Sequence, residues 1–215
     1  MLNEFSRTEL LLGREGMEAL SNASVAVFGT GETGSACVEA LARSGVGGLL
    51  LADPARFETI DASLTSSLET LGIPKAEAAA VRVADISRKC RTEIWTEPDA
   101  LPNLSGCAYV VDALEGEEEK LRLIQYAFES GIPVLSCLDM KKRLDVTRLQ
   151  VGDVSKAPGT EEFRRALRFA GIKKLKAVFS SEIPSAAGLS MPFVPEAAGL
   201  IAAGEVIKDL LKKST

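Results

Sequence analysis

The stretch Val25-Ala-Val-Phe-Gly-Thr-Gly-Glu-Thr-Gly34 decides which fold this sequence predicts. Its first four residues are apolar and favour strands, so they predict a buried strand over 25–28. Its glycines follow a G-x-G-x-x-G pattern at Gly29, Gly31 and Gly34. Apolar residues then recur at helical spacing over 34–44. A strand, a glycine turn and a helix in this order are typical of a nucleotide-binding unit.

The glycine turn can hold a phosphate group. Glycines permit close approach of the backbone, and the N-terminus of the following helix offers unpaired N–H groups with a partial positive charge. Asp53 ends the next predicted strand, over 49–52, and its carboxylate can accept hydrogen bonds from ribose hydroxyls. The alternative is a turn without a ligand, which Glu32 favours because its negative side chain would face the phosphate.

Lys75 favours ATP over a nicotinamide dinucleotide as the ligand. It begins a predicted helix over 74–88, roughly twenty residues beyond the ribose carboxylate. A lysine at this place can reach back to phosphates, for which a hydride-transferring enzyme has no obvious need. The alternative is a solvated lysine at the start of a helix.

Apolar strands alternate with helices through residue 135. Further strands are predicted over 93–96, 109–111 and 133–135, with a helix over 117–130. This alternation predicts an α/β, Rossmann-like, mostly parallel sheet with helices on both faces. The later chain predicts an antiparallel extension, with strands over 147–151 and 176–180 and helices over 161–171 and 192–211. We expect one domain over residues 1–215.

Composition excludes several kinds of chemistry. The chain has 215 residues and no histidine, which excludes a Ser-His-Asp triad, a Cys-His dyad and histidine-ligated zinc. None of its four cysteines forms a C-x-x-C pair, so we expect four buried thiols, with a nucleophilic Cys137 as the alternative. No apolar run approaches the roughly 18 residues of a membrane span. We expect a cytoplasmic protein without membrane contact.

Charge is distributed unevenly along the chain. Residues 141–176 carry eleven basic and four acidic side chains, a balance of +7 in a protein whose net charge is −5. A basic zone on an acidic protein can dock a polyanion. A solvated helix face is the alternative interpretation of the same residues.

Seven stretches of this sequence resemble the ThiF/MoeB/HesA family, which is related to ubiquitin-activating enzymes and adenylates carboxylates with ATP. The resemblance is greatest to the tRNA threonylcarbamoyladenosine dehydratases. The matching stretches lie at 5–13, 25–31, 40–47, 72–77, 110–113, 151–156 and 193–208. They run from residue 5 to residue 208, so the resemblance covers nearly the whole chain.

The resemblance implies a role for each matching residue. ATP would lie on Gly29, Gly31 and Gly34, with its ribose at Asp53 and with Asp112 also at the nucleotide. Lys75 and Arg7 would act on the phosphates, and family homodimers supply the arginine across their interface. The small residues of 197–204 could also lie close to a neighbouring chain.

The resemblance also implies a reaction. The substrate carboxylate attacks the α-phosphate of ATP, pyrophosphate leaves and an acyl-adenylate forms. In the dehydratases the carboxylate belongs to a threonylcarbamoyl group on a tRNA adenosine, and ring closure expels AMP. Such catalysis needs positioning and neutralised phosphate charge but no histidine. The basic zone 141–176 would then dock tRNA.

The sequence departs from the family pattern at the phosphate end. An Asn-x-x-Arg element reads Asp61-Ala-Ser-Leu64 here, and loss of such an arginine can lower a rate on the order of 10³-fold or more. Glu115 replaces the aspartate that holds Mg²⁺, and Ser136–Met140 replaces a glycine-rich segment. With Glu32, these are four changes.

Two functional hypotheses follow. In the first, the chain is a working ATP-dependent dehydratase in which Arg56 or another cation replaces the missing arginine. In the second, it is a degenerate homologue that keeps the fold and binds a nucleotide or a partner protein. A dehydrogenase that transfers hydride is a distant third.

Overall fold

The computed structural model describes residues 3–184 and 191–212, and its strands form one sheet. The strands of these residues are β1 (Ser24–Phe28), β2 (Gly48–Ala52), β3 (Arg91–Trp95), β4 (Tyr109–Asp112), β5 (Val134–Cys137), β6 (Leu149–Asp153) and β7 (Lys176–Ser180). They are ordered β3-β2-β1-β4-β5-β7-β6. All neighbours pair in parallel except β6 and β7, which are antiparallel. The predicted sheet with its antiparallel extension is therefore confirmed.

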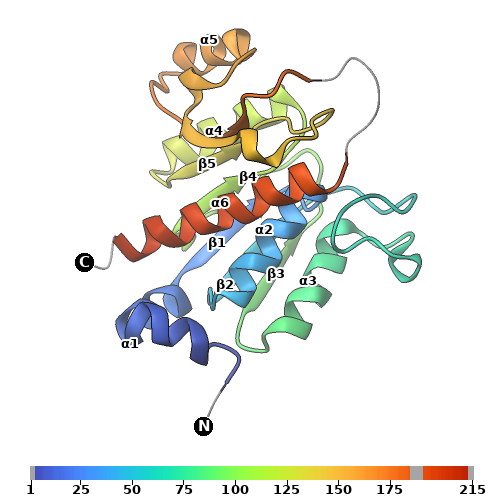
Figure 1. The fold of residues 1–215 in the computed structure, drawn as a ribbon, viewed down its shortest axis with the longest axis vertical. Helices are drawn as coiled ribbons and strands as arrows, with labels where there is room; N and C mark the ends of the chain where they lie inside the picture. The colour runs from blue at the N-terminus through green and yellow to red at the C-terminus, as the bar shows by residue number, and fades with distance from the viewer. Residues whose placement is uncertain (1–2, 185–190, 213–215) are drawn as a thin grey trace.

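The helices cover both faces of this sheet (Figure 1). In the described residues they are α1 (Ser6–Asn22), α2 (Glu32–Arg43), α3 (Lys75–Ile86), α4 (Glu117–Glu129), α5 (Glu161–Phe169) and α6 (Phe193–Lys212). Helices α1, α2, α3 and α6 pack with one face, whereas α4 and α5 pack with the other. Val25 and Val27 point to the first face and Ala26 and Phe28 to the second, because side chains alternate along a strand.

Small residues bring α6 close to α2. A Cβ atom added at Gly199 would collide with the backbone oxygen of Thr33 in α2, and Ala198 and Ala202 are fully buried. One side of the small-residue stretch 197–204 therefore packs within this chain, whereas Leu200 of the same stretch is 55% exposed. This contact also fixes the position of α2, whose N-terminus lies at the glycine turn.

Two connecting segments refine the sequence prediction. Gly13 has φ +72° and interrupts α1. Between β2 and α3, the described chain forms only one short helical turn, Leu68–Thr70, and an isolated bridge joins Arg56 to Pro74. No helix among residues 3–184 and 191–212 is both long and apolar enough to cross a membrane.

Candidate nucleotide-binding site

A cavity of about 350 Å³ opens at the carboxyl ends of the central parallel strands. It lies where the chain leaves β1 for α2 and where β4 pairs on the other side of β1, which is the usual place for a ligand in such sheets. Five of the residues expected to hold a nucleotide or metal line it, namely Gly29, Gly31, Asp53, Lys75 and Glu115, and Glu32 and Cys137 line it too. The fold therefore brings these five together.

The three glycines of the turn have different roles. Gly29 has φ +82°, and a Cβ atom there would lie 2.5 Å from the backbone oxygen of Ala113. A Cβ atom at Gly34 would collide with the backbone oxygen of Gly29. A Cβ atom at Gly31 would meet no atom within 4 Å. Gly29 and Gly34 thus allow the turn to close, whereas Gly31 leaves open space for a phosphate beside the N-terminus of α2.

Asp53 is almost fully buried and rigidly held at the edge of the cavity. Its Oδ2 accepts hydrogen bonds from the backbone N–H and the hydroxyl of Thr30, at 2.7 and 3.1 Å. Its Oδ1 accepts one from the backbone N–H of Ala55 at 2.9 Å. Each carboxylate oxygen has two lone pairs, so Oδ1 can still accept a hydrogen bond from a ribose hydroxyl.

A narrow apolar cavity of about 110 Å³ adjoins Asp53 on its other side. Its walls include Trp95, Leu101 and Leu114. The indole nitrogen of Trp95 donates a hydrogen bond to the backbone oxygen of Ala100 at 3.1 Å, which fixes the ring. A flat aromatic group attached to a ribose at Asp53 would fit against these walls.

Lys75 lies at the cavity but already has an anionic partner. Its Nζ donates to Oδ2 of Asp61 at 2.7 Å and lies 5.2 Å from the ring centroid of Phe57. Partial burial raises the pKa of Asp61, but hydrogen bonds from Lys75 and Ser63 outweigh this and hold it below its ordinary value. Asp61 therefore stays ionised at neutral pH and competes with any phosphate for Lys75.

Glu115 is paired in the same way with Lys141, which lies on the loop after β5. The Nζ of Lys141 is 2.6 Å from Oε2 of Glu115, and this hydrogen bond raises the pKa of Lys141. Sequence reasoning counted Lys141 only as part of the basic zone and did not place it at the cavity. The sequence did contain a signal for this position, because Lys141 immediately follows Ser136–Met140, the segment that replaces the family's glycine-rich one.

The residues present offer few ligands to a metal ion. Across 3–184 and 191–212, no three His, Cys, Asp or Glu side chains are grouped to hold a metal ion. A Mg²⁺ ion usually keeps several waters and binds one or two carboxylates together with phosphate oxygens. Glu115 fits that limited role, provided that Lys141 releases it.

The structure places Asp112 beneath the cavity and not at its surface. Its carboxylate is fully buried and accepts hydrogen bonds from the backbone N–H of Leu114, from Ser136 and from Lys120. Lys120 is also buried, and its third bond goes to the backbone oxygen of Cys137 at 2.7 Å. The expected contact between Asp112 and a nucleotide is therefore corrected, because this carboxylate supports the strand ends from below.

Three further residues lie away from the described wall of the cavity. Arg7 is exposed on α1. Arg56 donates to the backbone oxygen of Gly72 at 3.0 Å and lines a shallow depression on the far side of Lys75. Leu64, at the place of the family arginine, is 44% exposed, and its backbone N–H donates to Ser35 of α2. Within one chain, none of these residues supplies the missing cation.

The cysteines are free thiols, and only two of the four are fully buried. These two are Cys37 and Cys137, whereas Cys90 and Cys107 are half-buried. Cys137 borders the cavity, but burial raises the pKa of its thiol to about 12. A neutral thiol is a poor nucleophile, so this structure favours a packing role for Cys137.

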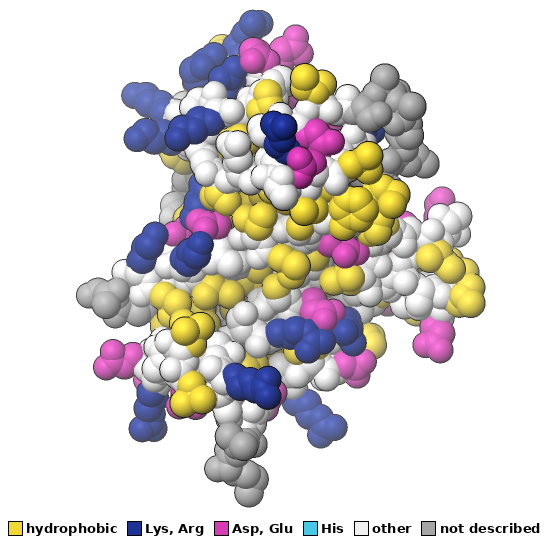
Figure 2. Space-filling view, viewed as in Figure 1, with side chains coloured by type: hydrophobic (Ala, Val, Ile, Leu, Met, Phe, Trp, Pro, Cys, Tyr) yellow, Lys and Arg dark blue, Asp and Glu magenta, His cyan; other side chains and the backbone are white. Residues whose placement is uncertain are grey.

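The basic zone 141–176 does not form a single surface. Arg143 is buried, Lys141 faces Glu115, and Lys176 pairs with Glu205 and Asp209 of α6. Figure 2 shows the Lys and Arg side chains that gather over α5. The candidate surface for a polyanion is therefore smaller than the sequence suggested.

A glycine turn, a buried carboxylate and a lysine at the carboxyl edge of a parallel sheet define a nucleotide-binding α/β protein. The chain belongs to the ThiF family, whose model matches residues 5–215. This match confirms the resemblance inferred from the sequence.

Individual relatives agree with the family assignment. The chain is 36% identical to the tRNA threonylcarbamoyladenosine dehydratase of Bacillus subtilis, over 99% of this chain and 96% of the relative. The crystal structure of Escherichia coli tRNA N6-threonylcarbamoyladenosine dehydratase, TcdA, in complex with ATP superposes with a TM-score of 0.89. It is 27% identical, and the match covers 98% of this chain and 95% of that chain. A complex of the same E. coli enzyme with AMP gives a TM-score of 0.87.

Proposed function

We propose that this chain binds ATP at the glycine turn and uses it to adenylate a carboxylate. The reaction that it most resembles is dehydration and cyclisation of threonylcarbamoyladenosine in tRNA. The observation that carries the proposal is the meeting of Gly31, Asp53 and Lys75 at one cavity. The relatives support the choice of ATP, since E. coli TcdA was crystallised with ATP and with AMP.

Each residue has a defined task in this proposal. Asp53 accepts a hydrogen bond from the ribose, and the N–H groups at the start of α2 face the phosphates. Lys75 turns from Asp61 towards the phosphates and neutralises part of their charge as pyrophosphate leaves. When Mg²⁺ is bound, it neutralises further phosphate charge, and Glu115 is the residue that would hold it.

Pyrophosphate release tests the proposal. Purified protein is mixed with ATP, Mg²⁺ and tRNA that carries threonylcarbamoyladenosine, and pyrophosphate is measured over time. Wild type should release it above background, and Lys75→Met should release at least tenfold less, because a phosphate-binding cation is lost. Lys142→Met is the control, since this exposed neighbour of Lys141 does not border the cavity. If neither wild type nor Lys75→Met releases pyrophosphate above background, the enzymatic proposal is overturned.

A specific observation favours the second candidate, a nucleotide-binding or partner-binding homologue without catalysis. Both lysines at the cavity are already paired with carboxylates, and Glu32 and Asp139 add further negative charge to its described wall. Calorimetry with ATP separates the candidates. Binding without pyrophosphate release identifies a nucleotide-binding homologue, whereas no binding at millimolar ATP leaves only the partner-binding alternative.

We also propose a homodimer in which a second copy supplies Arg7 to the cavity. Beside Arg7 on α1, Leu10 and Leu11 are 88% and 82% exposed, and an apolar pair this exposed is suited to burial against another chain. Sedimentation velocity should give a dimer mass that dissociates on dilution. A monomer mass at every concentration would contradict this proposal.

For tRNA docking we propose the surface of α5, defined here by Arg165, Arg168, Phe169 and Lys173. Phe169 is 97% exposed among cations, an arrangement that can stack an unpaired base while the cations contact phosphates. Arg165→Glu with Arg168→Glu should weaken tRNA binding and flatten its salt dependence. Unchanged binding would leave this surface as a solvated helix face.

Residues 1–215 are proposed to fold as one domain located in the cytoplasm. The packing of α6 on α2 ties the late chain to the early chain, which supports one domain. The four free thiols support a reducing compartment. Limited proteolysis of the folded protein should leave no stable half.

A further inference from the structure

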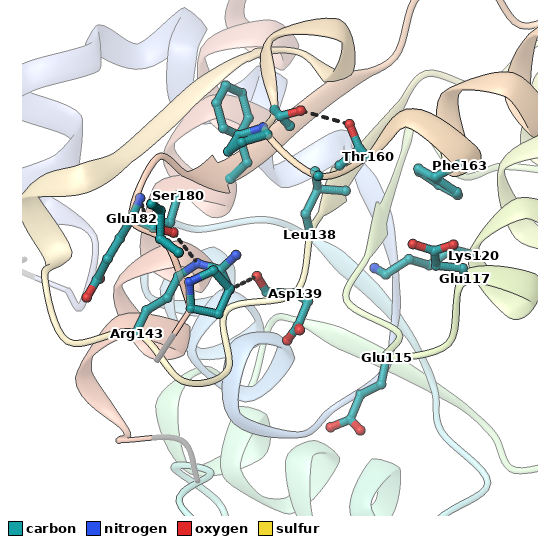
Figure 3. Close-up of a pocket in the computed structure, with 16 residues that line it drawn as sticks. Glu115, Glu117, Lys120, Leu138, Asp139, Arg143, Thr160, Phe163, Ser180 and Glu182 are labelled. Carbon is teal, nitrogen blue, oxygen red and sulfur yellow. Dashed lines mark hydrogen bonds between the residues drawn. The ribbon is translucent and has the colours of Figure 1, made fainter. Parts of the chain in front are cut away.

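A second cavity of about 430 Å³ adjoins the nucleotide cavity. Figure 3 shows the residues that line this second cavity. The two cavities share a wall made by Glu115, Leu138 and Asp139. The second cavity extends towards the carboxyl end of β7 and the start of α5. A ligand there would therefore lie beside a nucleotide bound at the glycine turn.

Arg143 offers this cavity an unused hydrogen-bond donor. The side chain is only 9% exposed, and its Nη1 donates to the backbone oxygens of Asp139 and Lys141 at 2.5 and 3.1 Å. Its Nε donates to the backbone oxygen of Glu182 at 3.3 Å, so the guanidinium is fixed between two segments (Figure 3). Nη2 makes no hydrogen bond with any residue that the structure describes. The Nη2 group therefore keeps N–H donors that a ligand carbonyl oxygen in the cavity can accept.

Carboxylates around the cavity select against an anionic ligand. Glu115, Glu117, Asp139 and Glu182 line it, and the only cations in its described wall are Lys120 and Arg143. Lys120 donates to Asp112 and Cys137, so it does not offset these charges. Glu182 accepts from the backbone N–H groups of Leu144 and Asp145, whereas Glu117 has no hydrogen bond or ion pair with a described residue.

The remaining polar groups favour a ligand with N–H donors. Glu117 and Oδ2 of Asp139 can accept hydrogen bonds from such groups, since Asp139 uses only Oδ1 within the described chain, to accept from the N–H of Lys141. Apolar wall is supplied by Phe163 and Phe179, both nearly buried in the core behind the cavity. A planar, neutral group with one carbonyl and adjacent N–H groups satisfies all of these partners.

We propose that this cavity binds the carbamoylated base of the acceptor substrate as a neutral ureido group. Its carbonyl oxygen accepts from Nη2 of Arg143, its N–H groups donate to Glu117 and Asp139, and the base lies against Phe163 and Phe179. This inference rests on the proposed function, because an adenylation reaction requires the acceptor substrate to lie beside the α-phosphate of ATP. It adds the location of that acceptor and the residues that recognise it.

The probe for this site is adenosine with a methylcarbamoyl group on N6, which has the ureido group but no carboxylate. Calorimetry on the full chain measures its affinity in saturating ATP. Glu117→Lys should weaken binding about tenfold, because it removes an acceptor and adds a repelling donor. Glu118→Lys is the matched control, with the same charge change in the same turn of α4 but outside the cavity wall, and its affinity should stay within about twofold of wild type.

The direction in which Glu117→Lys changes the affinity for the probe tests the ureido assignment. If Glu117→Lys binds the probe as tightly as wild type, or more tightly, the ureido assignment is overturned. Arg143→Lys should also weaken binding, and a thermal melt must accompany it because Arg143 holds three backbone oxygens. Glu117 is exposed and forms no pair with a described residue, so its substitution tests the proposal even if Arg143→Lys does not fold.

A second comparison separates this inference from the proposed function. ATP is titrated into wild type alone, which tests the nucleotide cavity independently. If ATP does not bind but the probe binds and depends on Glu117, the inference about the second cavity stands while the adenylation proposal fails. If the probe depends on Asp53 and not on Glu117, it occupies the nucleotide cavity and the inference is overturned.

Discussion

The ammonium group of Lys75 is 2.7 Å from the carboxylate of Asp61, and both side chains are largely shielded from water. This pair lies beside the space that Gly31 leaves open. In the family pattern, the position of Asp61 is an uncharged asparagine. The substitution turns a neutral neighbour of the lysine into a competitor for it.

Asp61→Asn should therefore strengthen ATP binding. The variant frees the charge of Lys75 while keeping a side chain of the same size, and a partly buried pair of this kind corresponds to roughly a fivefold change in affinity. Calorimetry with ATP–Mg²⁺ measures the gain. Glu69→Gln, an exposed carboxylate in the same connecting segment, should leave the affinity unaltered. A weaker or unchanged affinity for Asp61→Asn would argue that Lys75 does not meet the phosphates.

Lys141 should act as a phosphate-binding cation that the family pattern does not contain. Lys141→Gln removes this charge and leaves Glu115 uncompensated at the cavity, so ATP affinity should fall several-fold, about 1 kcal/mol. Lys142→Gln changes the neighbouring lysine, which has φ 61° and does not border the cavity. Equal effects of the two variants would indicate general charge attraction instead of a specific contact.

Lys120 and Asp112 should be important for stability. Lys120→Met leaves a fully buried carboxylate without its cation, and breaking such a pair commonly lowers the free energy of unfolding by about 3 kcal/mol. Urea denaturation measures this loss. Lys173→Met, at an exposed lysine, should change little. Addition of Asp112→Asn to Lys120→Met should recover part of the loss, and a further large drop would show that the charge was not the cause.

Acid should weaken the attachment of α6 to β7. A hydrogen bond from Lys176 lowers the pKa of Glu205. Burial raises the pKa of Asp209, but hydrogen bonds from Lys176 and Tyr109 outweigh it and leave a net lowering. A carboxyl group with a lowered pKa in the folded state binds its proton more readily when the chain is unfolded. Its contribution to stability is therefore present at neutral pH and is lost as pH falls below the ordinary carboxyl pKa of about 4.

Urea midpoints measured from pH 6 down to about pH 3 test this expectation. Wild type should lose stability over the acid part of that range. Asp209→Asn should start less stable and lose less on acidification. Parallel curves for the two proteins would mean that the acid sensitivity comes from elsewhere, for example from Glu39 and its two arginines.

The sequence was sufficient for the sheet and for the outline of the site, for identifiable reasons. Val25 and Val27 face one layer of helices while Ala26 and Phe28 face another, and a strand covered on both faces is apolar throughout. Gly29, Gly31 and Asp53 are fixed by the backbone between β1, α2 and β2, so their meeting follows from the topology.

The rest depended on side-chain directions that sequence does not contain. Lys141 and Arg143 belong to one basic run, but one borders the nucleotide cavity and the other is buried at the second cavity. Asp112 ends β4 much as Asp53 follows the end of β2, so the sequence alone predicts that both carboxylates face a ligand. Lys120 of α4 instead donates hydrogen bonds to the carboxylate of Asp112 and keeps it buried. This contact depends on how α4 packs against the sheet, which the sequence does not show.

Residues 139–143 connect the two cavities through a single short turn. The guanidinium of Arg143 donates a hydrogen bond to the backbone oxygen of Lys141, so this turn joins a residue at the nucleotide cavity to a residue at the second cavity. If a ligand in one cavity shifts the backbone of this turn, it changes the affinity of the other cavity, and thermodynamic linkage makes that effect equal in both directions. In such a protein the affinity for the nucleotide would depend on whether the second cavity is occupied, and the reverse.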